Sequence, residues 1–227
     1  MNVVKLLCGL IIVVAFTSCS KYVIQDRPIR FDEERVHLTL EYLSDRYEIE
    51  QTTPTIDPKM VVVHYTVIPT LEKTFVAFNN AKLPNWRAKI AGASALNVSS
   101  QFVVDQDGTI YRLMPETYMA RHVIGLNHCA IGIENVGGTE EVPLTDEQLQ
   151  SNIWLVKYLK KKYDIQYVIG HSEYTRFEGH ALWREVDKGY RTKKSDPGDA
   201  FMQRIRDATN DLGLLPLPPE PTQQEKI

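Results

Sequence analysis

The segment Met60-Val61-Val62-Val63-His64-Tyr65 determines how this 227-residue chain is interpreted. Its first four residues are all apolar and mostly β-branched, so the segment lacks the alternation of a strand with one exposed face. A continuous run of this kind is typical of a strand that is buried on both faces of a sheet. The run ends at His64, which places an imidazole at the end of a buried strand.

A second segment has the same design. Residues 166–170 read Gln-Tyr-Val-Ile-Gly, and His171 follows them directly; further along, Asp196 precedes Pro197-Gly198. Two imidazoles and one carboxylate would leave the fourth position of a tetrahedral zinc open, whereas structural zinc sites are usually closed by four protein ligands. An open position can hold a water molecule that zinc acidifies. His64, His171 and Asp196 therefore predict a zinc hydrolase.

Each of these residues also has a simpler interpretation. A histidine at the end of a strand is often only a polar surface residue. An aspartate before Pro-Gly is often only a turn residue.

The rest of the chain alternates between helical and strand patterns. The turn sequence Asp105-Gln106-Asp107-Gly108 between two β-runs predicts a hairpin, and Thr145 with Gln148 forms a capping box at the start of a helix. Together these patterns predict a mixed α/β fold in which one central mixed sheet is covered by helices. The other expected helices cover residues 31–47, 70–80, 86–95 and 198–212, and the other expected strands cover residues 100–104, 109–113 and 130–135.

We expect both ends of the chain to lie outside the main domain. Residues 1–18 contain an apolar run that is too short to span a bilayer, as in a secretory signal peptide. Cys19 resembles the lipidated cysteine of a bacterial lipoprotein; the alternative is an ordinary secretion signal with an incidental cysteine. Residues 19–57 would then supply this anchor, a tether over residues 20–30 and an N-terminal helix. Residues 213–227 are proline-rich and then polar, as in a disordered or surface-laid tail.

The charge of the chain bears on its binding partners, and its cysteine content bears on its disulfides. The chain has 26 Lys+Arg and 29 Asp+Glu, and its net charge of −3 gives no indication of nucleic-acid binding. Once the signal peptide and the lipidated Cys19 are set aside, Cys129 is the one cysteine left. We therefore expect no internal disulfide and a buried thiol at Cys129.

Four motifs in order resemble those of a known family. They are His64-Tyr65-Thr66, Ile131-Gly132-Ile133-Glu134, Ile169-Gly170-His171 and Lys194-Ser195-Asp196-Pro197-Gly198. Together they resemble the zinc-dependent type-2 N-acetylmuramoyl-L-alanine amidases, which share a fold with the peptidoglycan-recognition proteins and some phage amidases. The resemblance covers residues 58–212, which is nearly the whole mature domain.

The resemblance implies a role for each matching residue. His64, His171 and Asp196 would bind zinc, Glu134 would be the catalytic carboxylate, and Lys194 would stabilise the oxyanion. A carboxylate near the water can take its proton and pass it to the leaving amine, and a cation can stabilise a tetrahedral intermediate. The simpler alternatives are a salt-bridge partner for Glu134 and a solvated basic pair of Lys194 with its neighbour.

The family pattern also covers the surroundings of the site. It places His122 and Asn127 near the substrate, although His122 could equally be a core or surface histidine. The family often has a histidine where this chain has Gln101, which leaves Gln101 without a role. An insertion at residues 173–192 would line the substrate groove or form a surface loop, and it makes His180 a rival to Asp196 as third ligand.

We therefore expect a zinc amidase of the bacterial envelope, anchored to a membrane by lipid on Cys19. It would cleave the amide between N-acetylmuramic acid and L-alanine in peptidoglycan or muropeptides. Two alternatives remain: a peptidoglycan-binding module without activity, and a zinc peptidase that cuts within the stem peptide.

Overall fold

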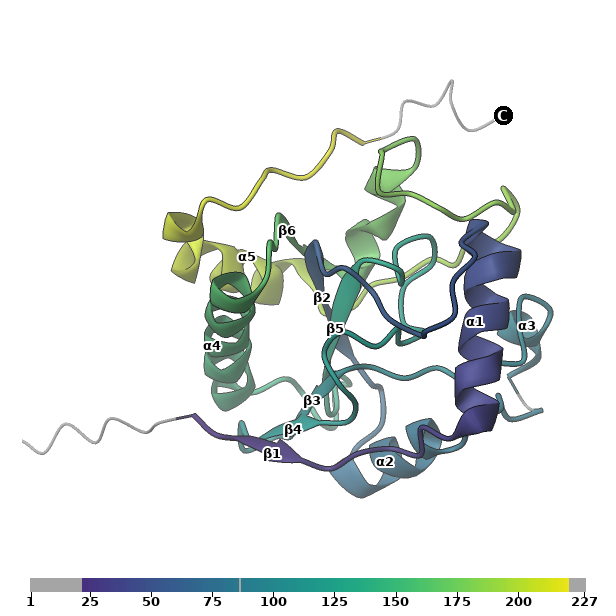
Figure 1. The fold of residues 1–227 in the computed structure, drawn as a ribbon. Helices are drawn as coiled ribbons and strands as arrows, with labels where there is room; N and C mark the ends of the chain where they lie inside the picture. Colours follow the sequence, from purple (N-terminus) through teal and green to yellow (C-terminus); the bar gives the residue numbers. More distant parts are fainter. Residues whose placement is uncertain (1–21, 86, 221–227) are drawn as a thin grey trace, which may run out of the picture.

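The computed structural model describes residues 22–85 and 87–220, which form a single mixed sheet with helices around it (Figure 1). The predicted α/β class is confirmed. The sheet has six strands in the order β1-β4-β3-β5-β2-β6. The strands are β1 (Ile24–Asp26), β2 (Met60–Tyr65), β3 (Phe102–Val104), β4 (Ile110–Arg112), β5 (Ala130–Asn135) and β6 (Tyr167–Gly170). The helices are α1 (Glu33–Tyr47), α2 (Leu71–Asn79), α3 (Ala88–Ala91), α4 (Asp146–Lys162) and α5 (Asp199–Ala208), with 3₁₀ helices at His171–Phe177 and Asn210–Leu212.

The directions of the strands bring the predicted site residues together where the carboxyl ends of β2, β5 and β6 meet. β2 lies between β5 and β6 and is parallel to both. The register pairs His64 with Glu134 and Val63 with Gly170, the residue before His171. Because the carboxyl ends of parallel strands meet at the same edge, the side chains that follow these strands gather there.

The core explains why β2 reads as a continuous apolar run. Val61 and Val63 belong to the cluster that includes the apolar face of α4, whereas Met60 and Val62 pack with Val123 and its neighbours on the opposite face. These four apolar side chains of β2 are fully buried, as the sequence predicts. In Figure 1, α4 and α5 lie on one side of the sheet and α1 lies on the other.

Helix boundaries follow the capping residues closely. The side chain of Thr145 accepts a hydrogen bond from the backbone N–H of Gln148, and the side chain of Gln148 accepts one from the backbone N–H of Thr145. These two bonds confirm the predicted capping box. The helix expected at residues 86–95 is much shorter and includes only α3. The backbone explains why, because Leu83 and Asn97 donate to carbonyls at Ala95 and Ala81 and so hold this part of the chain in an extended loop.

The expected tether over residues 20–30 is wrong for its central part. Ile24–Asp26 forms the edge strand β1, parallel to β4, and Arg112 donates to Asp26 at 2.7 Å. Edge pairing was missed because three residues carry too little pattern to predict a strand. The signal peptide at residues 1–18 and the lipidated Cys19 lie outside the described residues. Within the described part of the chain, no helix combines the length and apolarity needed to cross a membrane.

The start of the C-terminal tail lies on the protein surface. Leu215 donates its N–H to the carbonyl of Gln166, and Arg176 donates to the carbonyl of Pro218. The tail thus runs beside β6, the strand at one edge of the sheet, where an uncovered backbone would invite pairing with another chain. The start of the tail thus contacts the protein surface as far as Pro218.

Candidate metal centre and active site

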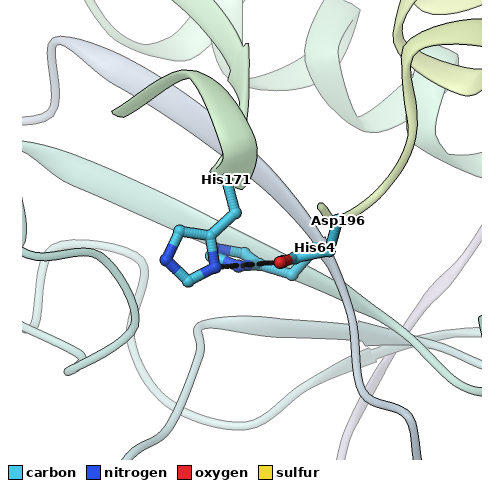
Figure 2. A group of neighbouring side chains, drawn as sticks. All are labelled: His64, His171 and Asp196. Atoms are coloured by element: carbon cyan, nitrogen blue, oxygen red, sulfur yellow. Dashed lines mark hydrogen bonds and ion pairs between the residues drawn. The ribbon is translucent and has the colours of Figure 1, made fainter. Parts of the chain in front are cut away.

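Three side chains from distant parts of the chain meet at the sheet edge (Figure 2). His64 comes from β2, His171 opens the 3₁₀ helix after β6, and Asp196 lies in the loop before α5. The Nδ1 atoms of the two histidines are 2.9 Å apart, and Oδ2 of Asp196 lies 3.1 Å from Nδ1 of His64 and 3.0 Å from Nδ1 of His171. Three potential ligand atoms therefore converge on one point.

This donor set fits a zinc ion. Zinc bonds of about 2.0–2.1 Å in a tetrahedron separate neighbouring ligand atoms by roughly 3.3 Å, close to the spacing found here. Two imidazole nitrogens and a carboxylate oxygen are ligands that zinc favours. The three residues are only 1% (His64), 6% (His171) and 8% (Asp196) exposed, so they are not the solvated surface residues of the simpler interpretation.

The protonation states also suit a metal. Burial, together with nearby His64, lowers the pKa of His171 to about 3, although Asp196 opposes the shift. Burial disfavours the charged form of Asp196, but contacts from both histidines hold the pKa of this carboxyl well below its ordinary value. At neutral pH the ring of His171 is therefore neutral and Asp196 is ionised, as metal binding requires.

His180 takes no part in this cluster. Its Nε2 atom lies 3.3 Å from the hydroxyl of Tyr167, and its ring packs against Phe177. Among the described residues, His64, His171 and Asp196 form the one group of at least three side chains arranged to hold a metal. The structure therefore places Asp196, and not His180, beside the two histidines.

Glu134 lies next to this cluster. It stands opposite His64 in the register of β2 and β5, and its Oε2 atom is buried without a hydrogen-bond partner among the described residues. Burial raises the pKa of Glu134 above its ordinary value, and His64 opposes this shift. A carboxylate with a free, buried oxygen is suited to exchange a proton with a ligand.

A cavity of about 570 Å³ adjoins the cluster and is lined by His171 and Lys194. Lys194 is exposed, and its charge lowers the pKa of Glu134 in opposition to burial. Tyr190 and Thr192 of the insertion also line the cavity. The end of the insertion therefore forms part of the groove wall.

The insertion is fixed to α1. Arg46 and Glu185 form an ion pair at 2.6 Å, with the Glu185 side chain fully buried. The Arg46 guanidinium also lies 4.8 Å from the centre of the Tyr190 ring, and Val186 donates its N–H to the carbonyl of Arg46. These contacts hold the groove wall against the domain.

His122 and Asn127 both border the cavity, but their polar atoms are engaged within the protein. Nδ1 of His122 lies 2.9 Å from Nε2 of His64, and the side-chain oxygen of Asn127 accepts from the N–H groups of His122 and Val123. Burial and nearby His64 lower the pKa of His122 well below its ordinary value, so its ring is neutral. The role of both residues in substrate binding stays a prediction.

Gln101 has a structural role that the sequence did not reveal. Its Nε2 donates to the carbonyl of Tyr118 at 2.8 Å, and its Oε1 accepts from the N–H of Gly132 at 2.7 Å. The side chain is fully buried. Gln101 therefore satisfies backbone groups beside β5, the strand that carries Glu134.

We expect Gln101→Ala to lower the free energy of unfolding by about 1–3 kcal/mol, because it leaves buried backbone groups without partners. Urea denaturation followed by circular dichroism would measure the change. Gln150→Ala, at an exposed position on α4, is the matched control and should shift stability by no more than about 0.5 kcal/mol. Equal effects of the two substitutions would contradict the role given to Gln101.

The candidate ligands and the free carboxylate are of the kind that a hydrolase needs. Residues 54–199 match the family described as N-acetylmuramoyl-L-alanine amidase, which is more than half of the chain. The chain belongs to this family, and the resemblance in its sequence motifs is confirmed. It is an amidase that hydrolyses amide bonds of peptidoglycan.

Solved structures agree with this fold. The N-acetylmuramoyl-L-alanine amidase LysC from Clostridium intestinale URNW is 22% identical, with a TM-score of 0.54 over 84% of this chain and 99% of LysC. The endolysin N-acetylmuramoyl-L-alanine amidase LysCS from the same organism is also 22% identical, with a TM-score of 0.52 over 83% of this chain and 95% of LysCS. At this identity the likeness shows the fold alone. No curated protein matches the chain.

Proposed function

We propose that the chain is a zinc-dependent amidase that cleaves the amide between N-acetylmuramic acid and L-alanine in peptidoglycan or muropeptides. One observation carries the proposal. The buried, unpartnered carboxylate oxygen of Glu134 lies on the strand next to His64, and His64 itself converges with His171 and Asp196 on one point.

Hydrolysis of an unactivated amide needs a nucleophile, stabilisation of the carbonyl oxygen, and a proton for the leaving amine. Zinc held by His64, His171 and Asp196 would lower the pKa of a water molecule and polarise the carbonyl. Glu134 would accept the proton of the attacking water on Oε2 and then donate it to the leaving nitrogen. A raised pKa suits Glu134 to hold the proton between these two transfers.

Lys194 would supply positive charge on the cavity side of the site. Its side chain lines the same cavity as His171, so its ammonium group can approach a substrate carbonyl bound there. A fixed positive charge stabilises the oxyanion of the tetrahedral intermediate more than it stabilises the neutral amide. Lys193 is also exposed but does not line the cavity, which argues against a merely solvated basic pair.

We expect Lys194→Met to lower kcat by about 10²–10³-fold, the usual cost of losing one group that stabilises an oxyanion. Lys193→Met removes the same charge one residue away and is the matched control, for which we expect nearly unchanged kcat. The assay is release of stem peptide from purified muropeptides. If both variants lose activity equally, Lys194 acts only through general charge.

Digestion of purified peptidoglycan by the full chain in detergent, with products identified by mass spectrometry, tests the proposal. We expect free stem peptides that begin at L-alanine, and we expect a zinc chelator to abolish them. Fragments cut inside the stem would establish the peptidase instead. Binding without cleavage would establish the recognition module, which the presence of Glu134 and of all three ligand residues disfavours.

We further propose that the enzyme works in the bacterial envelope, tethered by lipid on Cys19. The support is the apolar segment within residues 1–18, followed by Thr17-Ser18-Cys19, and the fact that peptidoglycan lies in the envelope. Expression in bacteria with radiolabelled palmitate would test the anchor, with Cys19→Ser as the control. Absence of label from the unaltered chain would contradict it.

A further inference from the structure

The ring of His122 lies between a proposed metal ligand and the backbone. Its Nδ1 atom is 2.9 Å from Nε2 of His64, and its Nε2 atom is 3.3 Å from the carbonyl oxygen of Ala130. The rings of His64 and His122 meet edge to face with centroids 5.0 Å apart. Both nitrogens of His122 are thus occupied inside the protein.

The direction of each hydrogen bond follows from the ligand cluster. Nδ1 of His64 faces His171 and Asp196, so it must be unprotonated to bind a metal. The ring proton of His64 then resides on Nε2 and is donated to Nδ1 of His122. His122 must in turn carry its own proton on Nε2, where the carbonyl of Ala130 accepts it.

The backbone around His122 is itself held in place. Oδ1 of Asn127 accepts from the N–H of His122 at 2.9 Å and from the N–H of Val123 at 2.8 Å. Nδ2 of Asn127 donates to the hydroxyl of Tyr47 at 2.9 Å, which connects this loop to the end of α1. All the polar side-chain atoms of Asn127 are therefore engaged.

Gly132 leaves the space that His122 occupies. A Cβ at this position of β5 would lie 3.0 Å from Cγ of His122, a tight contact that would require the ring to shift by a few tenths of an ångström. The ring therefore rests directly on the β5 backbone. This close contact limits how far the ring of His122 can move toward β5.

We propose that His122 is a positioning residue that holds His64 in the tautomer and orientation needed for zinc, and that Asn127 holds His122 in turn. The proposal rests on the zinc site of the proposed function. It assigns both residues to the metal side of the site rather than to substrate contact. Such outer partners of metal-binding histidines typically change metal affinity by about 10–100-fold.

Zinc affinity of the full chain, measured by competition with a chromogenic chelator, tests the proposal. We expect His122→Phe, which keeps a flat ring but removes both nitrogens, to weaken zinc binding by about 10–100-fold. His122→Asn places an amide oxygen near the position of Nδ1 and should recover most of the affinity. His37→Phe, at an exposed position on α1, is the matched control and should bind zinc as the unaltered chain does.

Two further measurements separate positioning from the other roles. At saturating zinc, KM for muropeptide should stay within about twofold of the unaltered chain in His122→Asn, and metal-free His122→Asn should unfold near the temperature of the unaltered chain. Unchanged zinc affinity with a raised KM would show a substrate contact and overturn the proposal. Weaker zinc binding that matches a loss of metal-free stability, without recovery in His122→Asn, would show a merely structural role and also overturn it.

The design distinguishes this proposal from the proposed function. If the unaltered chain binds no zinc, the zinc site itself is wrong and His122 has no ligand to position. If the unaltered chain binds zinc and His122→Phe binds it equally well, only the positioning role fails. Should the phenylalanine not fit beside Gly132, His122→Ala removes the same nitrogens without that bulk and gives the same comparison.

Discussion

Replacing Glu134 by glutamine is expected to lower kcat by about 10²–10⁴-fold, the range for loss of a group that transfers protons in the transition state. Glutamine keeps the size of the side chain but cannot accept a proton from the attacking water. Zinc binding should persist because Glu134 is not among the three converging ligands. Stem-peptide release and chelator competition on the same protein would measure both effects.

The burial of Glu134 makes this variant a clean test. Burial raises the pKa of the carboxyl group, so its charged form is held in the protein at some cost in stability. A neutral amide removes this cost, and we expect the variant to unfold at the same temperature or a higher one. Glu141→Gln, at an exposed position, is the control and should keep full activity. Full activity in Glu134→Gln would show that another group handles the proton.

Replacing His171 by alanine is expected to abolish measurable zinc binding and amidase activity together. Loss of an outer partner already costs about 10–100-fold in metal affinity, so loss of a direct ligand should cost more than about 100-fold. Asp196 would also lose one of the two contacts that stabilise its charge. Chelator competition and stem-peptide release again provide the measurements.

Thermal unfolding gives an independent measure of the same change. Zinc at 100 times its dissociation constant should stabilise the unaltered chain by about 2.7 kcal/mol, because zinc binds only the folded state, and His171→Ala should lose this gain. His180→Ala is the control, since His180 lies outside the cluster. An equal loss of zinc-dependent stability in both variants would contradict the ligand assignment.

Several parts of the site were predictable because each depends on a short stretch of chain. The apolar run of β2 ends at His64, and the strand before His171 has the same form, so local pattern alone located two candidate ligands at strand ends. Glu134 and Lys194 followed from motifs that resemble those of a family. The convergence of His64, His171 and Asp196 agrees with what these stretches predicted.

Other parts depended on contacts between distant residues. The sequence indicated no role for Gln101, because its hydrogen-bond partner Gly132 lies 31 positions away on another strand. The sequence left two alternatives for the insertion, a groove wall or a surface loop. In the structure, Glu185 of the insertion binds Arg46, which lies 139 positions away, and this contact holds the insertion against α1. Strand β1 was missed because only its pairing with β4 makes three residues into a strand.

The sequence by itself determined the class of fold, the capped helices, the hairpin and the chemical identity of the candidate metal ligands. Periodicity, capping and turn formation act over a few neighbouring residues, and side-chain chemistry is fixed by residue type. Only the tertiary structure decided that Glu134 stands beside His64 and that His122, 58 positions away, contacts the same imidazole. These arrangements depend on strand register and on packing between distant segments, which no short stretch of sequence encodes.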